Sequence, residues 1–406
     1  MKQIRVLNNP IQNYAWGSHT ALAELMGRTR PTPKPEAELL MGAHPKAPSQ
    51  VSVAGQWHAL PDWIASAPGA ILGREVCRRF NGQLPYLFKV LAIDKPLSIQ
   101  AHPNRHQASQ GFAREQRLMI PLDAPNRNYK DANHKPECLC ALTDFRALCG
   151  FRQVKQIIAL MERVCPPELD AVLDRLDAST DAQVLRAFFQ ALMTLDPVAQ
   201  AAVIRQTVDR ARQLTYQDPA YACLLGLHEC YPDDLGVLAP LFLNLIELAP
   251  DEALYLPAGE LHAYLHGVGV ELMANSDNVL RGGLTPKHVD LPELLKVLNF
   301  SVREAEVVVP EKQFGGERRY PTPAAEFVLS TIQVGTDEMY RSAADRSIEI
   351  LLCVQGRALI ATPDTKAPIE VGPGTAVVVP AAVPAYTLKG QGKFYKAAVP
   401  IRAPAK

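Results

Sequence analysis

The chain has 406 residues, 48% of them hydrophobic, so it can bury substantial cores and is too long for one ordinary domain. Lysine plus arginine and aspartate plus glutamate each number 42, so no net charge attracts nucleic acid or an anionic membrane. The start has no apolar signal core, no apolar run is long enough to span a bilayer, and the cysteines form no C-x-x-C pair. These features favour a reduced, cytoplasmic protein.

Two polar motifs mark the first hundred residues. The segment NYAWGS at Asn13–Ser18 is expected to be a loop, in which Trp16 could form an aromatic wall against a sugar. The segment PLSIQAHP at Pro96–Pro103 contains Gln100-Ala101-His102. On a strand, Gln100 and His102 point to the same face, which Ser98 shares.

A third polar motif, YKDANHKPE, ends at Glu137 and is expected to form a tight turn. His134 and Lys135 stand just before that carboxylate. Both could be structural donors within the turn or could contact a substrate, and the sequence leaves the two roles open.

The chain then changes character. Val154, Ile157, Ile158 and Met161 follow the i, i+3, i+4, i+7 spacing of an amphipathic helix. Similar patterns recur up to about residue 245, and none of them resembles a catalytic motif. We therefore predict a helical insertion at 151–245.

The richest segment is YLPAGELHAYLHGVGVELMANSDNVLRGGLTPK at 255–287. Its P-x-G-x-x-H spacing delivers His262 just after a turn that follows a short strand. A carboxylate, an Asp-Asn pair and two cations come soon afterwards, at Glu271, Asp277, Asn278, Arg281 and Lys287. A histidine, a carboxylate and cations in one short run favour a site for an anionic substrate.

Four residues in these motifs together form a mixed nitrogen and oxygen ligand set: Gln100, His102, Glu137 and His262. Each taken singly has an ordinary structural explanation, but the set suits one Zn²⁺ or a similar divalent ion per chain. The absence of cysteine favours a catalytic site with a position open to water or substrate.

All ten histidines lie between His19 and His288, so the tail cannot supply a histidine metal site. Four short β segments are expected in that tail, separated by Gly, Pro and Asp turns: SIEILLCVQG, RALIATP, TAVVVPA and KFYKAAVPI.

These motifs resemble the type I mannose-6-phosphate isomerase (phosphomannose isomerase) family, zinc-dependent proteins of the cupin fold, in their bacterial form. Both signature segments are present, Y-x-D-x-N-H-K-P-E at 129–137 and H-A-Y…E-x-M-A-x-S-D-N…R-x-G-x-T-P-K at 262–287. NYAWGS and AELLMGAHP (37–45) fit as well. Leu40 stands where the family often has Trp, and Gly282 where it often has Ala.

The resemblance implies a mainly β fold with an α-helical insertion: two cupin-like (jelly-roll) barrels plus a helical domain. The expected division is a metal-bearing catalytic domain at 1–150 and 246–310, the helical insertion at 151–245, and a metal-free cupin-like barrel at 311–406.

The resemblance also implies an aldose–ketose isomerase that interconverts mannose 6-phosphate and fructose 6-phosphate by zinc-assisted proton transfer through a cis-enediol, with Arg281 catalytic. The base stays open among Glu271, Lys135 and His134. A small sugar phosphate is the expected partner, with no nucleic acid or membrane, and the protein is expected to be a monomer. We expect substrate contacts from Trp16, Ser98, Tyr264, Asp277 and Lys287.

Two other classes stay open at this stage. A cupin oxygenase would hold iron on a three-histidine or histidine–carboxylate set, whereas a glutamine ligand and a cation-rich rim fit sugar phosphate chemistry better. A non-enzymatic sugar-phosphate sensor would be expected to have lost the metal ligands or Arg281, and this chain keeps both.

Overall fold

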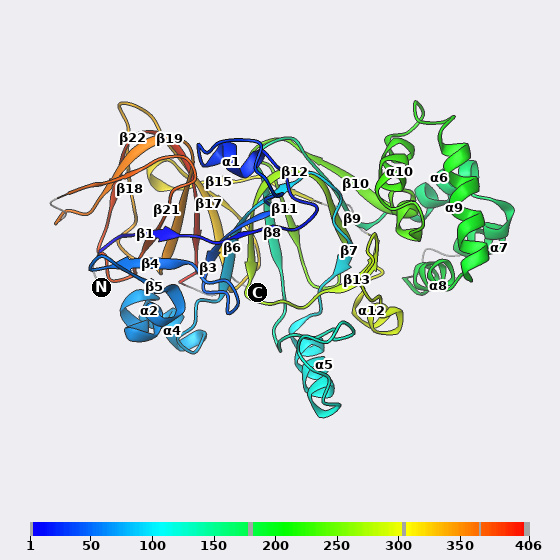
Figure 1. The fold of residues 1–406 in the computed structure, drawn as a ribbon, viewed down its shortest axis with the longest axis horizontal. Helices are drawn as coiled ribbons and strands as arrows, with labels where there is room; N and C mark the ends of the chain where they lie inside the picture. Colours follow the sequence, from blue (N-terminus) through cyan, green and yellow to red (C-terminus); the bar gives the residue numbers. More distant parts are fainter. Residues whose placement is uncertain (1–2, 178–181, 303–305, 365–366, 402–406) are drawn as a thin grey trace.

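The computed structural model describes residues 3–177, 182–302, 306–364 and 367–401, which form two antiparallel sheets and several helices (Figure 1). The central sheet has the strand order β14-β11-β8-β12-β6-β3-β2, and β7, β9, β10 and β13 join it off this path. Its strands are β2 (Ile11–Gln12), β3 (Glu38–Gly42), β6 (Tyr86–Ile93), β7 (Ile99–Ala101), β8 (Glu137–Ala141), β9 (Phe145–Phe151), β10 (Leu243–Leu248), β11 (Ala253–Leu256), β12 (His262–Ala274), β13 (Leu280–Gly283) and β14 (Val307–Val308).

The second sheet, here called the C-terminal sheet, has the order β15-β16-β17-β22-β19-β21-β1-β4-β5, with β18 on β22 and β20 on β19. Three of its strands come from the N-terminus, so the two ends of the chain share one sheet. Its strands are β1 (Arg5–Asn8), β4 (Gln50–Val53), β5 (Gln56–Ala59), β15 (Glu311–Lys312), β16 (Glu317–Tyr320), β17 (Val328–Val334), β18 (Met339–Arg341), β19 (Glu349–Ala361), β20 (Ile369–Val371), β21 (Ala376–Val379) and β22 (Thr387–Ala398).

The main core lies between these two sheets. Phe88 and Leu272 of the central sheet join one buried cluster with Ile350, Leu352 and Tyr395 of the C-terminal sheet. All eight residues of β6 are buried, so β6 is covered on both faces. The central sheet is therefore supported from behind by the C-terminal sheet.

Strand β12 positions the candidate site. Its second half pairs with β6 and β8, and its first half pairs with β7 and β9. Gly267 lies at the change of partners with φ +120°, and a Cβ there would approach the Asp144 carbonyl oxygen to 2.7 Å. Only glycine fits this close crossing, because other residues rarely adopt that φ and have no room for a side chain.

Helices gather beyond β9 and β10, at the end of the long axis opposite the C-terminal sheet (Figure 1). Two of them begin with an aspartate cap and a proline, at Asp196 and Asp218. The helices of this region are α6 (Val154–Val164), α7 (Asp170–Asp177), α8 (Ala182–Met193), α9 (Pro197–Ala211), α10 (Pro219–Cys230) and α11 (Ala239–Phe242), with 3₁₀ turns η1 (Pro167–Leu169) and η2 (Leu235–Leu238).

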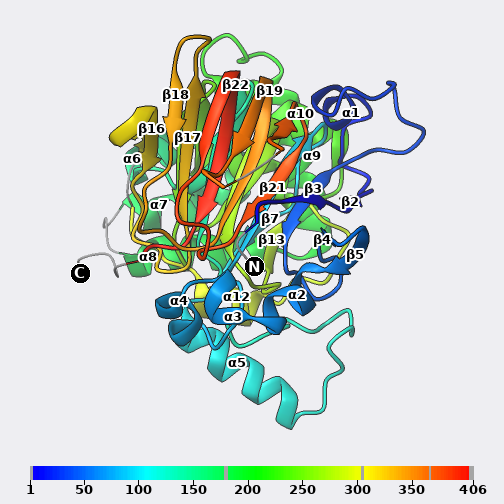
Figure 2. The same cartoon turned by 90° about the vertical axis from the view of Figure 1, so that its left-hand side faces the viewer.

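The other helices are short or peripheral. In Figure 2, α2, α3 and α4 lie together, and α5 runs below them. Their bounds are α1 (Ala21–Leu25), α2 (Leu60–Ser66), α3 (Pro68–Ile71), α4 (Arg74–Arg79), α5 (Arg105–Arg117) and α12 (Leu291–Val297), with the 3₁₀ turn η3 (Phe314–Gly316). Within the described ranges, no single helix is long and apolar enough to cross a bilayer. Only α8 and α9 taken together meet these two criteria, and they are bent by 102° relative to each other.

One expectation about the tail is wrong. The segments SIEILLCVQG and RALIATP are not two strands separated by a turn but one continuous strand, β19. Gly356 lies inside it with φ +74°, just after a register shift between Cys353 and Gln355. A glycine in a β-bulge bends a strand without ending it, and sequence alone does not separate this case from a turn.

The coarse fold class, mainly β with helices, is confirmed. The strand pairs of the described residues form two open paths, with no closed ring of pairs, so two complete barrels are not shown by these pairings.

Candidate metal centre and active site

Three of the four expected ligands converge at the ends of neighbouring strands. His102 follows β7, Glu137 begins β8 and His262 begins β12, and one ligand atom from each lies within 4.8 Å of the others. Glu137 Oε1 is 3.2 Å from His102 Nε2, and Glu137 Oε2 is 3.6 Å from His262 Nε2. All three side chains are buried, with about 1% of each exposed.

The histidine rings are oriented by backbone carbonyls. His102 Nδ1 lies 2.7 Å from the Asn278 carbonyl, and His262 Nδ1 lies 2.9 Å from the Glu260 carbonyl. A carbonyl only accepts, so Nδ1 bears the proton in each ring and Nε2 is left with a lone pair. Both Nε2 atoms are buried without a hydrogen-bond partner among the described residues. Two such lone pairs aimed at one carboxylate fit a divalent metal.

The electrostatics agree with that fit. Burial lowers the pKa of His102 and lowers that of His262 to about 4, which keeps both imidazoles neutral. Burial alone would raise the pKa of Glu137, but the ammonium of Lys135 holds it well below its usual range. Lys135 Nζ is 2.7 Å from Glu137 Oε1. The ligand set thus combines two neutral nitrogens with one ionised carboxylate.

Strand register places the fourth expected ligand, Gln100, and the expected catalytic arginine, Arg281, in one row with His262. Gln100 lies directly opposite His262 across the β7–β12 pair, and Arg281 lies directly opposite Gln100 across the β13–β7 pair. Opposed residues of an antiparallel pair project from the same face with their Cβ atoms about 5 Å apart. Gln100 therefore stands between His262 and Arg281 in one row.

A second charged group lies on β12. Glu271 is buried, and its Oε2 is 3.1 Å from Lys89 Nζ, which also lies 3.8 Å from Glu38. Burial raises the pKa of Glu271, and the nearby Glu137 carboxylate raises it further, against the effect of Lys89. Despite burial, Glu38 and Glu271 raise the pKa of Lys89, which keeps it protonated.

Two cations lie together at the edge of the site. Burial lowers the pKa of both Arg281 and Lys287, and the charge of Arg281 lowers that of Lys287 further. No carboxylate among the described residues forms an ion pair with either of them. Asp277 has other partners, since its Oδ1 lies 3.0 Å from His44 Nε2.

Of the remaining expected residues, Tyr264 contacts the ligand set, whereas Trp16, Ser98 and His134 have no contact with it in the described residues. Tyr264 is fully buried and donates a hydrogen bond of 3.3 Å to Glu137 Oε2, so it touches the metal set itself. Trp16 is stacked on Tyr14 at 5.8 Å, and Ser98 is half-buried just before β7. His134 Nε2 is held by Glu326, 2.8 Å away.

Sequence reasoning missed Lys89, His44 and Glu326. Lys89 had a usable signal, because it is the one charge in the apolar run PYLFKVLAI, and a buried charge needs a partner. His44 lies in AELLMGAHP, a motif noted only for its resemblance. Glu326 had no signal, since its partners lie about 200 residues away in the sequence.

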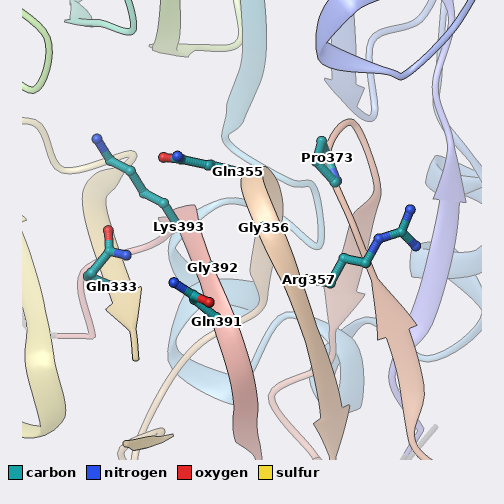
Figure 3. A pocket seen from close by; sticks show the side chains of 8 residues that line it. All are labelled: Gln333, Gln355, Gly356, Arg357, Pro373, Gln391, Gly392 and Lys393. Atoms are coloured by element: carbon teal, nitrogen blue, oxygen red, sulfur yellow. The ribbon is translucent and has the colours of Figure 1, made fainter. Parts of the chain in front are cut away.

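Figure 3 shows a different cavity, of about 550 Å³, on the C-terminal sheet. Its two cations already have acidic partners: Lys393 Nζ lies 2.5 Å from Asp251, and Arg357 lies 3.1 Å from Glu370. None of the expected site residues lines it. The convergent ligands on the central sheet are therefore the stronger candidate site.

Comparison with known proteins places this site in a family. A family model for the catalytic domain of phosphomannose isomerase type I matches residues 4–154. The chain is 40% identical to mannose-6-phosphate isomerase of Escherichia coli (strain K12) over 396 residues, 96% of this chain and 97% of that protein. It is 36% identical to mannose-6-phosphate isomerase of Homo sapiens over 398 residues, 91% of each chain.

Solved structures agree. A point mutant of phosphomannose isomerase from Salmonella typhimurium superposes with a TM-score of 0.90 at 37% identity, covering 98% of this chain and 99% of that one. A zinc-bound mannose 6-phosphate isomerase superposes with a TM-score of 0.89 at the same identity and coverage. The fold and the site together define a class of protein: a mainly β protein with a histidine–carboxylate site that could hold a metal ion. Within that class, the chain belongs to the type I phosphomannose isomerase family.

Proposed function

We propose that this protein is a metal-dependent aldose–ketose isomerase that interconverts mannose 6-phosphate and fructose 6-phosphate. The observation that supports it most directly is the convergence of His102, Glu137 and His262 in a chain that aligns with mannose-6-phosphate isomerases over nearly its whole length. The row His262–Gln100–Arg281 and the two neighbouring cations, Arg281 and Lys287, favour a sugar phosphate over the substrates of an oxygenase. The chain keeps both the metal ligands and Arg281, which favours an enzyme over a non-enzymatic sensor.

The metal set would be His102, His262, Glu137 and Gln100, holding one Zn²⁺. The two partnerless Nε2 atoms support this assignment, because buried nitrogens without a hydrogen bond are costly unless something binds them. Bound zinc would act as a Lewis acid that polarises the C1 and C2 oxygens of the sugar and stabilises the negative charge that develops there.

The protein's own cations would anchor the substrate. Arg281 and Lys287 have no acidic partner within the described part of the chain, so both are available to an anion. The guanidinium of Arg281 presents a fixed fork of donors beside Gln100, which suits an oxyanion near the metal. Lys287 would hold the phosphate and so orient the reacting carbons.

Glu271 is our choice for the base that moves the proton between C1 and C2. A carboxylate whose pKa is raised by burial is a stronger base than an exposed one. Lys135 Nζ lies 2.7 Å from Glu137 Oε1, and this contact makes it less available to the sugar. His134 Nε2 lies 2.8 Å from both Glu326 and Arg105, and these contacts make it less available to the sugar.

We also propose the finer architecture expected from the resemblance. Each sheet would fold over as a cupin-like barrel, the metal-bearing one interrupted by the helices at 151–245, and the one at 311–406 would bind no metal. The shared core between the sheets and the position of the helices at one end support this division. Every proposed site residue comes from one chain, so a monomer would suffice.

The test combines metal analysis with a coupled assay. The purified protein should contain about one zinc per chain and should convert mannose 6-phosphate to fructose 6-phosphate, losing the activity with a chelator and regaining it with Zn²⁺. A protein that holds zinc but converts neither sugar phosphate would contradict the proposed function. Iron in place of zinc, with oxygen consumption, would favour the oxygenase.

A further inference from the structure

One buried asparagine joins the two loops that lead into the metal cluster. Asn278 lies in the loop at 275–279, between β12 and β13, and has no exposed surface. Its backbone carbonyl accepts the hydrogen bond of 2.7 Å from His102 Nδ1. Although the sequence groups Asn278 with residues expected around an anionic substrate, a side chain with no exposed surface does not reach one. Its polar atoms therefore serve other residues of the protein.

The side chain of Asn278 binds the other loop, the polar turn at 129–136. Its Oδ1 accepts hydrogen bonds from the backbone N–H groups of Lys130 and Asp131, at 2.7 and 3.2 Å. Its Nδ2 donates to the carbonyls of Asp131 and Asn133, at 2.9 and 2.8 Å, and to the Asp131 carboxylate at 3.2 Å. The oxygen meets only donors and the nitrogen only acceptors, so these partners fix the orientation of the amide.

Asp131 binds the loop of Asn278 in return. Its carboxylate accepts hydrogen bonds from the Ser276 hydroxyl at 2.9 Å and from the Asp277 N–H at 2.8 Å. We call the side-chain contacts of Asp131 and Asn278 across the two loops the Asp131–Asn278 clamp. Its partners are 145 to 148 residues apart in the sequence. The clamp therefore fixes two distant segments to each other through side chains.

Both ends of the clamp lead directly to a metal ligand. The turn at 129–136 runs into Glu137, the first residue of β8. The loop at 275–279 holds the ring of His102 through the Asn278 carbonyl. Because His102 Nε2 and Glu137 Oε1 lie 3.2 Å apart, a shift of one loop against the other would separate the two ligands. Groups that orient metal ligands by hydrogen bonding typically contribute about 10- to 100-fold to metal affinity.

We propose that Asn278 is a positioning residue that sets the metal affinity of the site, because it holds His102 and the turn before Glu137 in place before the metal binds. This inference rests on the metal assignment of the proposed function. An amide is needed at this position, since one side chain accepts from two N–H groups and donates to two carbonyls at once. A carboxylate cannot donate to those carbonyls, and an aliphatic side chain can do neither.

Zinc affinity, measured by competition with a chelator, tests the proposal without any turnover. Asn278→Asp keeps the shape of the side chain and its accepting oxygen. It replaces the donating nitrogen by an oxygen that faces the Asp131 carboxylate and the Asn133 carbonyl. We expect this variant to bind zinc about tenfold more weakly or worse. Asn278→Ala removes every side-chain contact of the residue and should weaken zinc binding at least as much.

Thermal unfolding separates this role from a purely structural one. A structural loss would lower the Tm of the metal-free and the zinc-loaded protein equally, whereas a positioning role reduces the rise in Tm that zinc adds. Ser347→Ala is the matched control, because Ser347 is buried and its hydroxyl binds both the N–H and the carbonyl of Val399, each at 2.9 Å. It should keep wild-type zinc affinity. Wild-type zinc affinity in both Asn278 variants, or an equal loss in Ser347→Ala, would overturn the proposal.

A hydrogen-exchange measurement needs no variant. The N–H groups of Lys130 and Asp131 should exchange slowly in the metal-free and the zinc-loaded wild type alike, because Asn278 holds them without the metal. Protection that appears only with zinc would overturn the proposal even if the variants failed to fold. Zinc content and isomerase activity of the wild type are measured in parallel. A wild type without zinc would overturn both proposals, whereas an active zinc protein with unaffected variants would overturn only this one.

Discussion

The ammonium of Lys89 lies 3.1 Å from a carboxylate oxygen of Glu271, and the two residues stand directly opposite each other across β6 and β12. Both are buried, so neither charge is stable without the other. This pair sets the basicity of the carboxylate that we propose as the base.

Replacing Lys89 with methionine should therefore raise the pKa of Glu271 further. The ammonium of Lys89 lowers this pKa, against burial and the charge of Glu137, and the substitution removes it. A base is active when deprotonated, so the acidic limb of the kcat profile should move to higher pH by about one unit or more. Lys396→Met is the matched control, since Lys396 is also buried and bound to two glutamates, but in the C-terminal sheet. An unshifted acidic limb in Lys89→Met would remove Glu271 from the role of base.

Replacing His262 with alanine should remove the metal more than the fold. The core between the sheets does not include His262, so circular dichroism should stay near wild type. Loss of one imidazole ligand should weaken zinc binding at least about 100-fold, with activity lost in parallel. His266→Ala changes an exposed histidine of the same strand and should keep its zinc. A fully loaded and active His262→Ala protein would exclude His262 as a ligand.

Arg281 and Lys287 should respond differently. If Arg281 acts on the transition state, Arg281→Lys should lower kcat about 100-fold with a modest change in KM, because lysine keeps the charge and loses the fork of donors. Lys287→Ala should mainly raise KM, since its proposed role is to hold the phosphate in the ground state. Steady-state kinetics of both, with zinc content measured in each, decide the point. Near wild-type turnover in Arg281→Lys would return Arg281 to a structural role.

The buried charges of the C-terminal sheet should make stability depend on pH. Burial alone would raise the pKa of Glu317, but Lys396, at 2.7 Å, and a hydrogen bond from the Tyr340 hydroxyl hold it below its usual value. This stabilisation is complete above the unfolded-state pKa of about 4.3 and is lost as pH falls through the lower folded-state pKa. Glu317→Gln should lower the free energy of unfolding by about 3 kcal/mol at neutral pH.

Thermal unfolding of the wild type and Glu317→Gln between about pH 3 and pH 7 measures this effect. The difference in Tm should shrink as the pH is lowered. The isomerase activity of the folded variant should be unchanged, because Glu317 lies outside the proposed site. A constant Tm difference across this range would show that the loss comes from packing and not from charge.

The sequence by itself determined which local segments matter. Gln100 and His102 share a face because of their spacing on a strand, and His262 is placed by the turn that P-x-G-x-x-H encodes. The apolar spacing from Val154 to Met161 predicted a helix, and α6 covers it. These signals are local, since period, turn chemistry and residue type depend only on near neighbours in the chain.

Only the tertiary structure decided which charges meet. The pairing of β6 with β12 puts Lys89 against Glu271, the β13–β7 register puts Arg281 beside Gln100, and the packing of the C-terminal part puts Glu326 against His134. Gly356 likewise became a bulge and not a turn because β19 has strand partners on both sides of it. Contacts of this kind depend on strand register and on packing between distant segments, which residue spacing along one chain does not encode.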